Sequence, residues 1–233
     1  MEYSLHVRMN AHLFLRDPEG SDLGRRIVRQ GTLLFDEVGF EEATFKKLAE
    51  RLNTKEASIY RYFENKHRLL VYLVAWYWQW MEFQLVFQTN NLADPHEKLE
   101  RLLRLVLLKD VAPTATDDID IRALHGIVVR ESSKAYLTRH VTEDNRHQLF
   151  KPYKDLCSRI AGIILEYHPD YPYARSVASS LIETAHYQTF FMQNLPSLTD
   201  FASKPGNTGG DSTKLLRFMR HLLFSALDTP TSP

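Results

Sequence analysis

Apolar residues recur at the spacing of an α-helix in the stretch 44–68 of this chain. The first of these residues occupy positions i, i+3, i+4 and i+7: Phe45, Leu48, Ala49 and Leu52. Such positions share one face of a helix, which leaves the charged residues on the other faces. Thr44 can cap the start of this helix, and Asn53 tolerates the left-handed conformation of the tight turn that ends it.

A second, shorter helix is predicted from Lys55, with Thr54 as its N-cap. Its apolar positions are Ala57, Ile59, Tyr60 and Phe63. A helix of about two turns depends on packing rather than on propensity, so we expect Ile59 and Phe63 to pack against the preceding helix. Asn65 is then expected to cap a third helix. The pattern therefore predicts two short helices at a tight turn, followed by a longer one.

The same helical spacing continues along the chain and predicts an all-α fold. The helix capped by Asn65 is expected to span 65–87, and six further helices are expected at residues 21–39, 94–107, 119–137, 143–167, 173–195 and 211–227. Pro152 is predicted to kink the helix that contains it. Gly31 costs a helix interior about 1 kcal/mol relative to Ala, which suggests a close approach by another helix. Phe40 is expected to fill the small core formed by the first helices.

Two stretches depart from an ordinary amphipathic helix. Residues 4–16 alternate apolar and polar side chains, and this period of two predicts an extended arm that lies on the body of the protein. The run 69–87 is apolar nearly all round, so it is either a membrane span or a buried core helix. Gln79, Glu82 and Gln84 interrupt it, and we expect a buried helix.

Charge is balanced overall, with 29 basic and 29 acidic residues, but it is locally basic in the predicted helix pair. Seven basic residues there face three acids: Lys46, Lys47, Arg51, Lys55, Arg61, Lys66 and Arg68 against Glu50, Glu56 and Glu64. A local excess suits a surface that meets phosphates, whereas the neutral total argues against a protein that coats nucleic acid. In a helix-turn-helix, the start of the second helix enters the major groove. The donors expected to stay outside and reach the groove are Lys55, Ser58, Tyr60, Arg61 and Tyr62.

Enzyme and metal chemistry find little support in the sequence. His96 with Glu100, and His140 with Asp144 and His147, have helical ligand spacing but no further ligand of fixed geometry. The glycines at 206, 209 and 210 precede no Lys-Ser/Thr pair that would cradle a phosphate. We therefore expect no enzyme activity, no cofactor and no metal. The only cysteine, Cys157, forms no internal disulfide, and together with the lack of a signal peptide this predicts a cytoplasmic protein.

Fourteen positions carry a resemblance to a known family: Ile27, Leu34, Phe35, Gly39, Phe40, Leu48, Ala49, Ile59, Tyr60, Tyr62, Phe63, Asn65, Lys66 and Leu69. With this spacing, about the first seventy residues resemble the tetracycline-repressor (TetR) family of bacterial transcription regulators. Asn53 departs from the glycine that is usual in the family, and Lys55 departs from its serine or threonine. These departures leave the operator sequence open.

The resemblance implies a division into four parts: an N-terminal arm (1–20), a helix-turn-helix DNA-binding domain (21–67), a helical ligand-binding and dimerisation domain (68–228) and a tail (229–233). It further implies which residues meet DNA: Thr44, Lys55, Glu56, Ser58, Tyr60, Arg61, Tyr62 and Lys66. Thr44 and Lys66 are expected to meet phosphates. Glu56 either accepts a hydrogen bond from a cytosine amino group or forms an ion pair with a neighbouring basic side chain.

A homodimer through Tyr173–Leu195 and Asp211–Leu227 is also implied, bound to a palindromic double-stranded operator and released by an unidentified apolar or aromatic effector. A two-fold dimer sets its reading helices about one DNA turn apart, roughly 34 Å. The candidate pocket residues are Trp76, Trp80, Phe83, His125, Tyr136, Tyr153, His186 and Tyr187. The alternative is a dimeric all-α protein-interaction or ligand-binding module without ligand-gated DNA binding.

Overall fold

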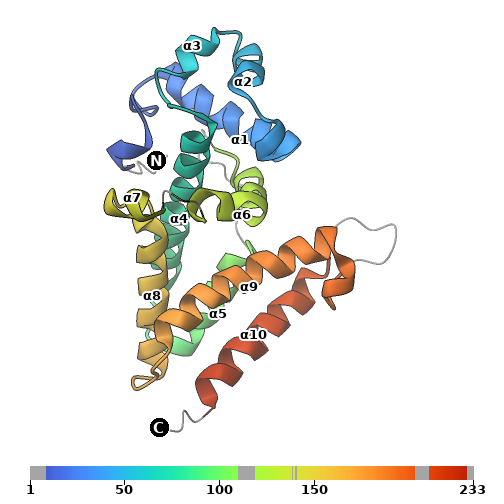
Figure 1. Ribbon diagram of the computed structural model, residues 1–233. Helices are drawn as coiled ribbons and strands as arrows, with labels where there is room; N and C mark the ends of the chain where they lie inside the picture. The colour runs from blue at the N-terminus through green and yellow to red at the C-terminus, as the bar shows by residue number, and fades with distance from the viewer. Residues whose placement is uncertain (1–8, 110–118, 138, 140, 203–209, 230–233) are drawn as a thin grey trace. The chain divides into compact units, whose positions relative to one another are not determined.

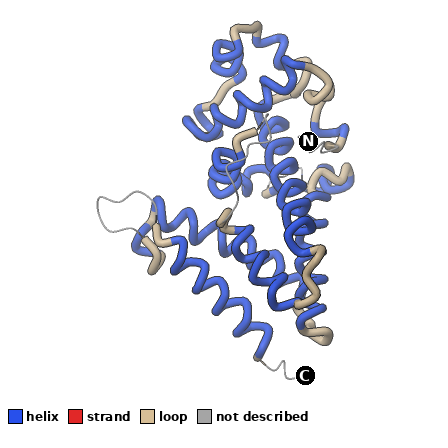
Figure 2. The backbone as a smooth tube through the Cα atoms, turned by 180° about the vertical axis from the view of Figure 1, so that it is seen from behind, coloured by secondary structure: helices blue, strands red, loops and turns tan. Residues whose placement is uncertain are grey.

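Helices make up nearly all the regular structure of residues 9–109, 119–137, 139, 141–202 and 210–229, which this computed structural model describes (Figures 1 and 2). The predicted all-α fold is confirmed, and these residues include no β-strand. The α-helices are α1 (Asp22–Glu42), α2 (Phe45–Leu52), α3 (Glu56–Ile59), α4 (Lys66–Thr89), α5 (Pro95–Val106), α6 (Ile121–Tyr136), α7 (Val141–Arg146), α8 (Lys151–Tyr167), α9 (Ala174–Asn194) and α10 (Ser212–Asp228). Two short 3-10 helices, η1 (Ala11–Leu13) and η2 (Pro196–Leu198), complete the set.

The chain divides into two compact units. The first comprises Met1–Trp80 and Ala112–Tyr153, and the second comprises Met81–Val111 and Lys154–Pro233. The first unit therefore holds α6 and α7 together with α1, α2 and α3. This grouping by compactness differs from the predicted boundary at residue 67, which is a division by function and stays a prediction.

Helix α1 is fixed at its start by a capping residue and at its middle by a close contact with α4. Ser21 caps the start, and its Oγ accepts a hydrogen bond from the backbone N–H of Gly24 at 3.1 Å. Midway along the helix, a Cβ added to Gly31 would lie 3.0 Å from the Leu69 side chain of α4. The predicted close approach at Gly31 is confirmed, and it lets α4 pack tightly against α1.

Helix α4 is buried along most of its length. Its side chains from Leu69 to Trp78 are all at most 4% exposed. Among the described residues, no helix is long and apolar enough to cross a membrane. The buried-helix interpretation of the run 69–87 therefore holds.

Two other predictions about the first unit are wrong in detail. The described part of the predicted extended arm contains the 3-10 helix η1, and Leu13 is 1% exposed while Leu15 is 66% exposed, so these two residues do not share a buried face. The expected helix 143–167 is two helices, because Gln148 takes a left-handed φ of 57° between α7 and α8. Pro152 lies in the first turn of α8, where a missing N–H costs nothing, and causes no kink.

The second unit shows the caps that the sequence predicts. Asp94 accepts a hydrogen bond from the N–H of His96 at 2.9 Å at the start of α5. Asp211 accepts from Thr213 and Lys214, at 3.0 Å each, at the start of α10. The apolar side of α10 is buried at Leu215, Leu216, Met219, Leu223 and Leu227.

The backbone at Gly39 generates the first testable prediction. Its φ of 75° and ψ of 167° lie in a region that essentially only glycine occupies, and it interrupts α1 one turn before the helix ends at Glu42. An added Cβ would have room, 3.6 Å from Glu131 Oε1, so Gly39→Ala should cost only backbone strain, about 1–3 kcal/mol of unfolding free energy. Urea unfolding measures this loss.

Gly162, in α8, is the matched control. No atom lies within 4 Å of a Cβ added there, and its φ is helical. Gly162→Ala should therefore raise the unfolding free energy by up to about 1 kcal/mol. Equal effects of the two substitutions would contradict the role given to Gly39.

Candidate nucleic-acid interface

The turn between α2 and α3 is built by local sequence. Thr44 Oγ1 accepts a hydrogen bond from the N–H of Lys47 at 3.2 Å, which confirms the predicted N-cap of α2. Asn53 has φ 49° and ψ 51°, the left-handed conformation expected of it. The prediction that Thr54 caps α3 is wrong. The N-cap of α3 is Lys55, and its side chain makes no capping hydrogen bond. Helix α3 has only four residues, and the expected second helix ends in turns after Ile59.

A small apolar core holds these short helices. Ile59 and Phe63 are both 0% exposed, which confirms that they pack inward. The edge of the Phe63 ring meets the Tyr72 ring of α4 at a centroid distance of 5.4 Å. Helix α3 is therefore positioned by its neighbours rather than by its own length.

Most of the predicted DNA contacts are accessible. Thr44, Lys55, Glu56, Tyr60 and Arg61 are exposed, and Ser58 is half-buried. Tyr60 is 47% exposed and rests the edge of its ring against Phe45, at 5.0 Å between centroids.

The basic residues of α2 and α3 fall into two sets. Arg51 is held by both carboxylate oxygens of Glu37, and Lys47 Nζ donates to the main-chain oxygen of Glu42 at 2.7 Å. Lys46, Lys55 and Arg61 form no side-chain hydrogen bond or ion pair with any described residue. These three cations are the ones left for an outside anion.

Tyr62 does not stay on the outside as expected. Its side chain is 3% exposed, and its hydroxyl shares a hydrogen bond with Ser21 Oγ at 2.8 Å. Its main-chain oxygen accepts from the N–H of Leu15 at 2.7 Å. The turn after α3 directs the ring inward because a short helix cannot keep residue 62 on the face of residue 58.

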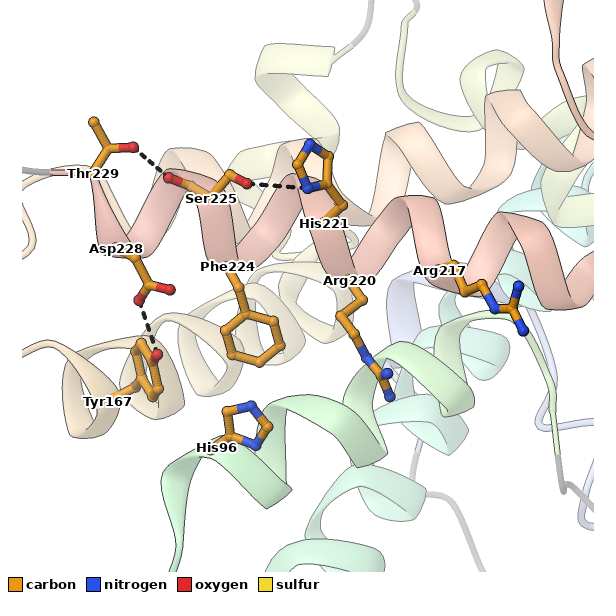
Figure 3. Close-up of a pocket in the computed structure, with 9 residues that line it drawn as sticks. All are labelled: His96, Tyr167, Arg217, Arg220, His221, Phe224, Ser225, Asp228 and Thr229. Atoms are coloured by element: carbon orange, nitrogen blue, oxygen red, sulfur yellow. Dashed lines mark hydrogen bonds between the residues drawn. The ribbon is translucent and has the colours of Figure 1, made fainter.

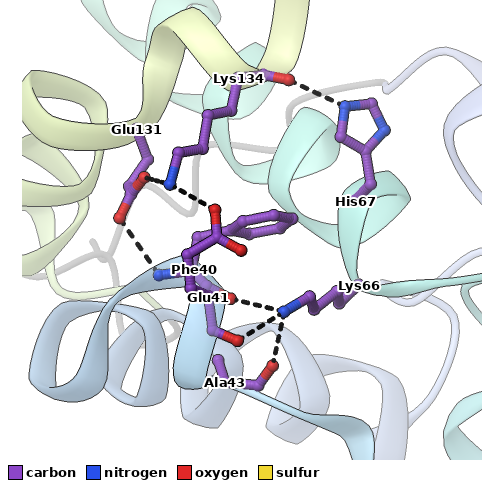
Figure 4. A network of polar contacts seen from close by, with 7 residues as sticks. All are labelled: Phe40, Glu41, Ala43, Lys66, His67, Glu131 and Lys134. Carbon is purple, nitrogen blue, oxygen red and sulfur yellow. Dashed lines mark hydrogen bonds and ion pairs between the residues drawn. The ribbon is translucent and has the colours of Figure 1, made fainter.

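Lys66 holds the end of α1 (Figure 4). Its Nζ donates to the main-chain oxygens of Phe40 and Glu41 at 2.8 Å each and of Ala43 at 3.2 Å. The last carbonyls of a helix lack partners within the helix, and an ammonium group is well suited to them. Lys66 reaches a phosphate only by giving up these bonds. The Lys66 ammonium lies 4.6 Å from the centre of the Phe40 ring. Phe40 is only half-buried, whereas the sequence predicts that it fills the core.

Helix α6 secures the same end of α1. Glu131 Oε1 accepts from the N–H of Phe40 at 3.1 Å, and Lys134 Nζ bridges Glu131 at 2.9 Å and Glu41 at 2.8 Å (Figure 4). The hydrogen bond from Lys134 lowers the pKa of the Glu41 carboxyl, and the same bond raises the pKa of Lys134. One turn earlier in α1, Arg130 Nη2 meets Asp36 Oδ1 at 2.6 Å.

The candidate effector residues of the first unit occupy two places. Tyr136 and Tyr153, stacked at 6.0 Å with 7° between their planes, line a pocket whose free volume is about 10 Å³. Trp76 and Trp80 are buried, 4% exposed each, and do not line it. His125 Nδ1 shares a 2.7 Å hydrogen bond with the Tyr77 hydroxyl.

Sequence reasoning missed most of the pocket lining: Val71, Val74, Ala75, Trp78, Ala135, Leu149 and Phe150. They come from α4, α6 and the α7–α8 connection. The small and branched residues of this set carry no chemical signal in a sequence. Only the run of tryptophans on α4 pointed to this region.

The remaining candidates lie in the second unit. Phe83 is 45% exposed and stacks on Phe87 at 6.3 Å, Tyr187 is 54% exposed, and His186 is buried. This unit also has an open groove of about 740 Å³ along α10 (Figure 3). None of the candidates lines this groove, whose floor is a stack of His96 on Phe224 at 4.6 Å.

Metal ligands do not cluster in the described part of the chain, where no group of three or more His, Cys, Asp or Glu residues could hold an ion. His140, which the sequence placed with Asp144 and His147, lies outside that part. Asp144 is 2% exposed, and its carboxylate accepts from Arg68 Nη1 at 2.9 Å.

The helix-turn-helix matches a known family. The profile described as "Bacterial regulatory proteins, tetR family" covers residues 27–73, from the middle of α1 into α4. The match is to the helix-turn-helix region of that family and ends within α4. No curated protein sequence matches this chain.

Solved structures share the fold of this chain along most of its length. The fatty acid degradation regulator FadR from Bacillus halodurans is 18% identical, with 89% of this chain and 96% of that chain covered and a TM-score of 0.58. AibR in complex with isovaleryl coenzyme A and operator DNA is 17% identical (86% and 98% covered, TM-score 0.56). A putative transcriptional regulator from Saccharomonospora viridis in complex with choline is 18% identical (89% and 97% covered, TM-score 0.59).

The environment of His125 predicts a specific acid sensitivity. Burial lowers the pKa of His125 to about 4, against an ordinary value of 6.5. The unfolded chain therefore binds a proton at a higher pH than the folded chain does. The free energy of unfolding should fall as the pH drops from about 6.5 to about 4, by at most about 3 kcal/mol from this group.

His125→Gln tests this, because an amide still hydrogen-bonds to Tyr77 but does not titrate. Urea unfolding of both proteins across this pH range should show a smaller loss for the variant. Parallel curves would contradict the assignment.

Proposed function

We propose that the chain is a repressor that binds a palindromic operator as a homodimer and leaves it when a small apolar or aromatic molecule binds. The observation that carries DNA binding is the set of exposed cations without a partner among the described residues, Lys46, Lys55 and Arg61. They lie on α2, at the N-cap of α3 and in the turn after α3 of a tetR-type helix-turn-helix. Cations in this state lose little on meeting phosphates, and they release counterions from DNA.

Helix α3 enters the major groove in this proposal. Lys55 and Glu56 are at its first turn, and the start of the second helix of a helix-turn-helix reads base edges. Ser58, Tyr60 and Arg61 follow towards the backbone, and Thr44 meets a phosphate at the start of α2. Glu56 distinguishes this surface, since a carboxylate accepts a hydrogen bond from a cytosine amino group and repels phosphates.

The homodimer uses α9 and α10. Both helices carry large exposed apolar side chains, Tyr187 at 54% and Leu222 at 40%. A two-fold interface is self-complementary, so the same apolar patch on each protomer meets its copy.

The effector site is the apolar pocket of the first unit. Four of its nine lining residues are aromatic: Trp78, Tyr136, Phe150 and Tyr153. None of the nine is charged, so a neutral apolar or aromatic molecule suits the lining. Proteins of similar fold have been solved in complex with choline, or with isovaleryl coenzyme A and operator DNA, and they support a ligand-controlled regulator.

A gel shift with DNA selected from random duplexes tests the operator proposal. The selected sites should be palindromic, and log affinity should fall linearly with log salt. Lys55→Ala and Arg61→Ala should each weaken binding roughly tenfold and, where the lost contact is a phosphate, reduce the salt slope by about one.

Arg122→Ala, which removes an exposed cation at the start of α6, away from the helix-turn-helix and from α9 and α10, is the matched control and should leave the affinity unchanged. Binding that is insensitive to both α3 variants would refute this interface. Complete absence of DNA binding would favour a ligand-binding or protein-interaction module.

Indole and naphthalene are suitable neutral aromatic probes of the effector site. Each should quench or shift tryptophan fluorescence, because Trp78 lines the pocket, and should release the bound DNA. Ala135→Leu fills part of the pocket and should weaken probe binding at least tenfold. Probe binding that survives unchanged in Ala135→Leu would place the effector site elsewhere.

A further inference from the structure

Residues 9–20, which we call the N-terminal segment, are fixed at both ends within the first unit. Near one end, the N–H of Leu15 donates to the main-chain oxygen of Tyr62 at 2.7 Å, and the Arg16 guanidinium lies 5.3 Å from the centre of the Tyr62 ring. Pro18 packs so closely on α1 that a Cβ added to Gly24 would lie 2.2 Å from the Pro18 oxygen. The segment is therefore attached to the corner between α3 and α4.

The other end of the segment contacts the end of α7. Asn10 Nδ2 donates to the main-chain oxygen of His147 at 2.7 Å. The His12 ring stacks on the His147 ring, with centroids 4.5 Å apart and 14° between the planes. Between the two attachments, Leu13 is 1% exposed and anchors the short helix η1. Only four residues lie between Asn10 and Leu15, so the connection has little slack.

His147 lies next to the wall of the apolar pocket. Leu149 and Phe150, two and three residues further on, line that pocket. Gln148, between His147 and Leu149, takes the left-handed conformation. Backbone in sparsely populated regions concentrates at places that switch. The pocket holds about 10 Å³, whereas sites for small molecules measure roughly 300–1,000 Å³. Any occupant must displace a wall.

The wall formed by Leu149 and Phe150 is the one that can yield. The opposite lining residues belong to α4 and α6, long helices fixed in the core or tied to α1. Helix α7 has only six residues and is held by the Arg68–Asp144 ion pair and by the N-terminal segment.

We propose that the N-terminal segment transmits occupancy of the apolar pocket to the helix-turn-helix. When the α7–α8 corner moves outward, Asn10 and His12 follow His147, and the movement reaches Tyr62 through Leu15. Tyr62 ends the turn that positions α3, so the base-reading residues are displaced. The inference rests on the proposed effector site, and it assigns a role to a segment outside the family's helix-turn-helix.

A double-mutant cycle tests the connection without an identified effector. Leu149→Trp places extra volume in the pocket and imitates an occupant. It should lower the affinity for the selected DNA at least tenfold, within the 5- to 150-fold range of typical allosteric couplings. In the Asn10→Ala/His12→Ala background, which removes both contacts with His147, the same substitution should have an effect at least threefold smaller.

The control is Ala11→Ser, at an exposed position of η1 that makes no contact with His147, in which Leu149→Trp should act as in the unmodified chain. Circular dichroism checks that each variant folds. If Leu149→Trp does not fold, Ala135→Leu fills the same pocket and carries the comparison. Equal effects of the filling substitution with and without the His147 contacts, or no effect at all, would overturn the proposal.

Amide hydrogen exchange separates this proposal from the proposed function. Without DNA, Leu149→Trp should speed exchange in residues 56–63, and this change should disappear in the Asn10→Ala/His12→Ala background. A protein that binds no DNA but shows this pattern would refute the repressor and keep the connection. A protein that binds DNA but whose exchange in residues 56–63 ignores the pocket would keep the repressor and refute the connection.

Discussion

The carbonyl end of α1 needs partners, and the way it obtains them governs the whole first unit. Three main-chain oxygens at this end accept from one ammonium group, that of Lys66 at the start of α4. Across α1, Glu131 and Lys134 of α6 bind the N–H of Phe40 and the carboxylate of Glu41. The end of one helix is thus a joint between three helices, because unpaired terminal groups of a helix are costly to leave without partners.

This joint explains why α6 belongs to the same compact unit as the helix-turn-helix. Arg130 adds an ion pair with Asp36, and Gly126 approaches the same carboxylate closely enough that a Cβ there would lie 3.0 Å from Asp36 Oδ1. The start of α2 follows directly from this end of α1. Any change in the position of α6 is therefore felt where the DNA-reading helices begin. In a regulator, such a joint sets how firmly the two functions are connected.

Two routes connect the apolar pocket with the helix-turn-helix in this unit. One passes through α6, which carries both Ala135 of the pocket and Lys134 of the joint. The other passes through α7 and the N-terminal segment to Tyr62. The α6 route involves charged groups paired across long, rigid helices. The N-terminal route relies on hydrogen bonds to main-chain oxygens and on ring stacking around a six-residue helix. We infer that this route, which contains no ion pair between long helices, responds first.

Local chemistry, which the sequence contains in full, determined the helices and their ends. Thr44, Asp94 and Asp211 cap helices through bonds to residues two or three positions away, and Asn53 needs only its own left-handed backbone. The inward positions of Ile59 and Phe63 followed from periodicity, as did the all-α fold. The spacing of these residues also carried the family resemblance.

Only the tertiary structure decided what the interior and the connections do. Lys66 meets oxygens up to 26 residues away, Lys134 meets Glu41 across 93 residues, and Asn10 meets His147 across 137. A sequence pattern records which face a side chain occupies but not which distant group competes for it. The sequence therefore predicts DNA contacts for Lys66 and Tyr62, which stay predictions, but not that a helix end and a serine hydroxyl hold these side chains. The pocket lining was hidden for the same reason, since contacts between apolar side chains arise only when the helices that carry them pack together.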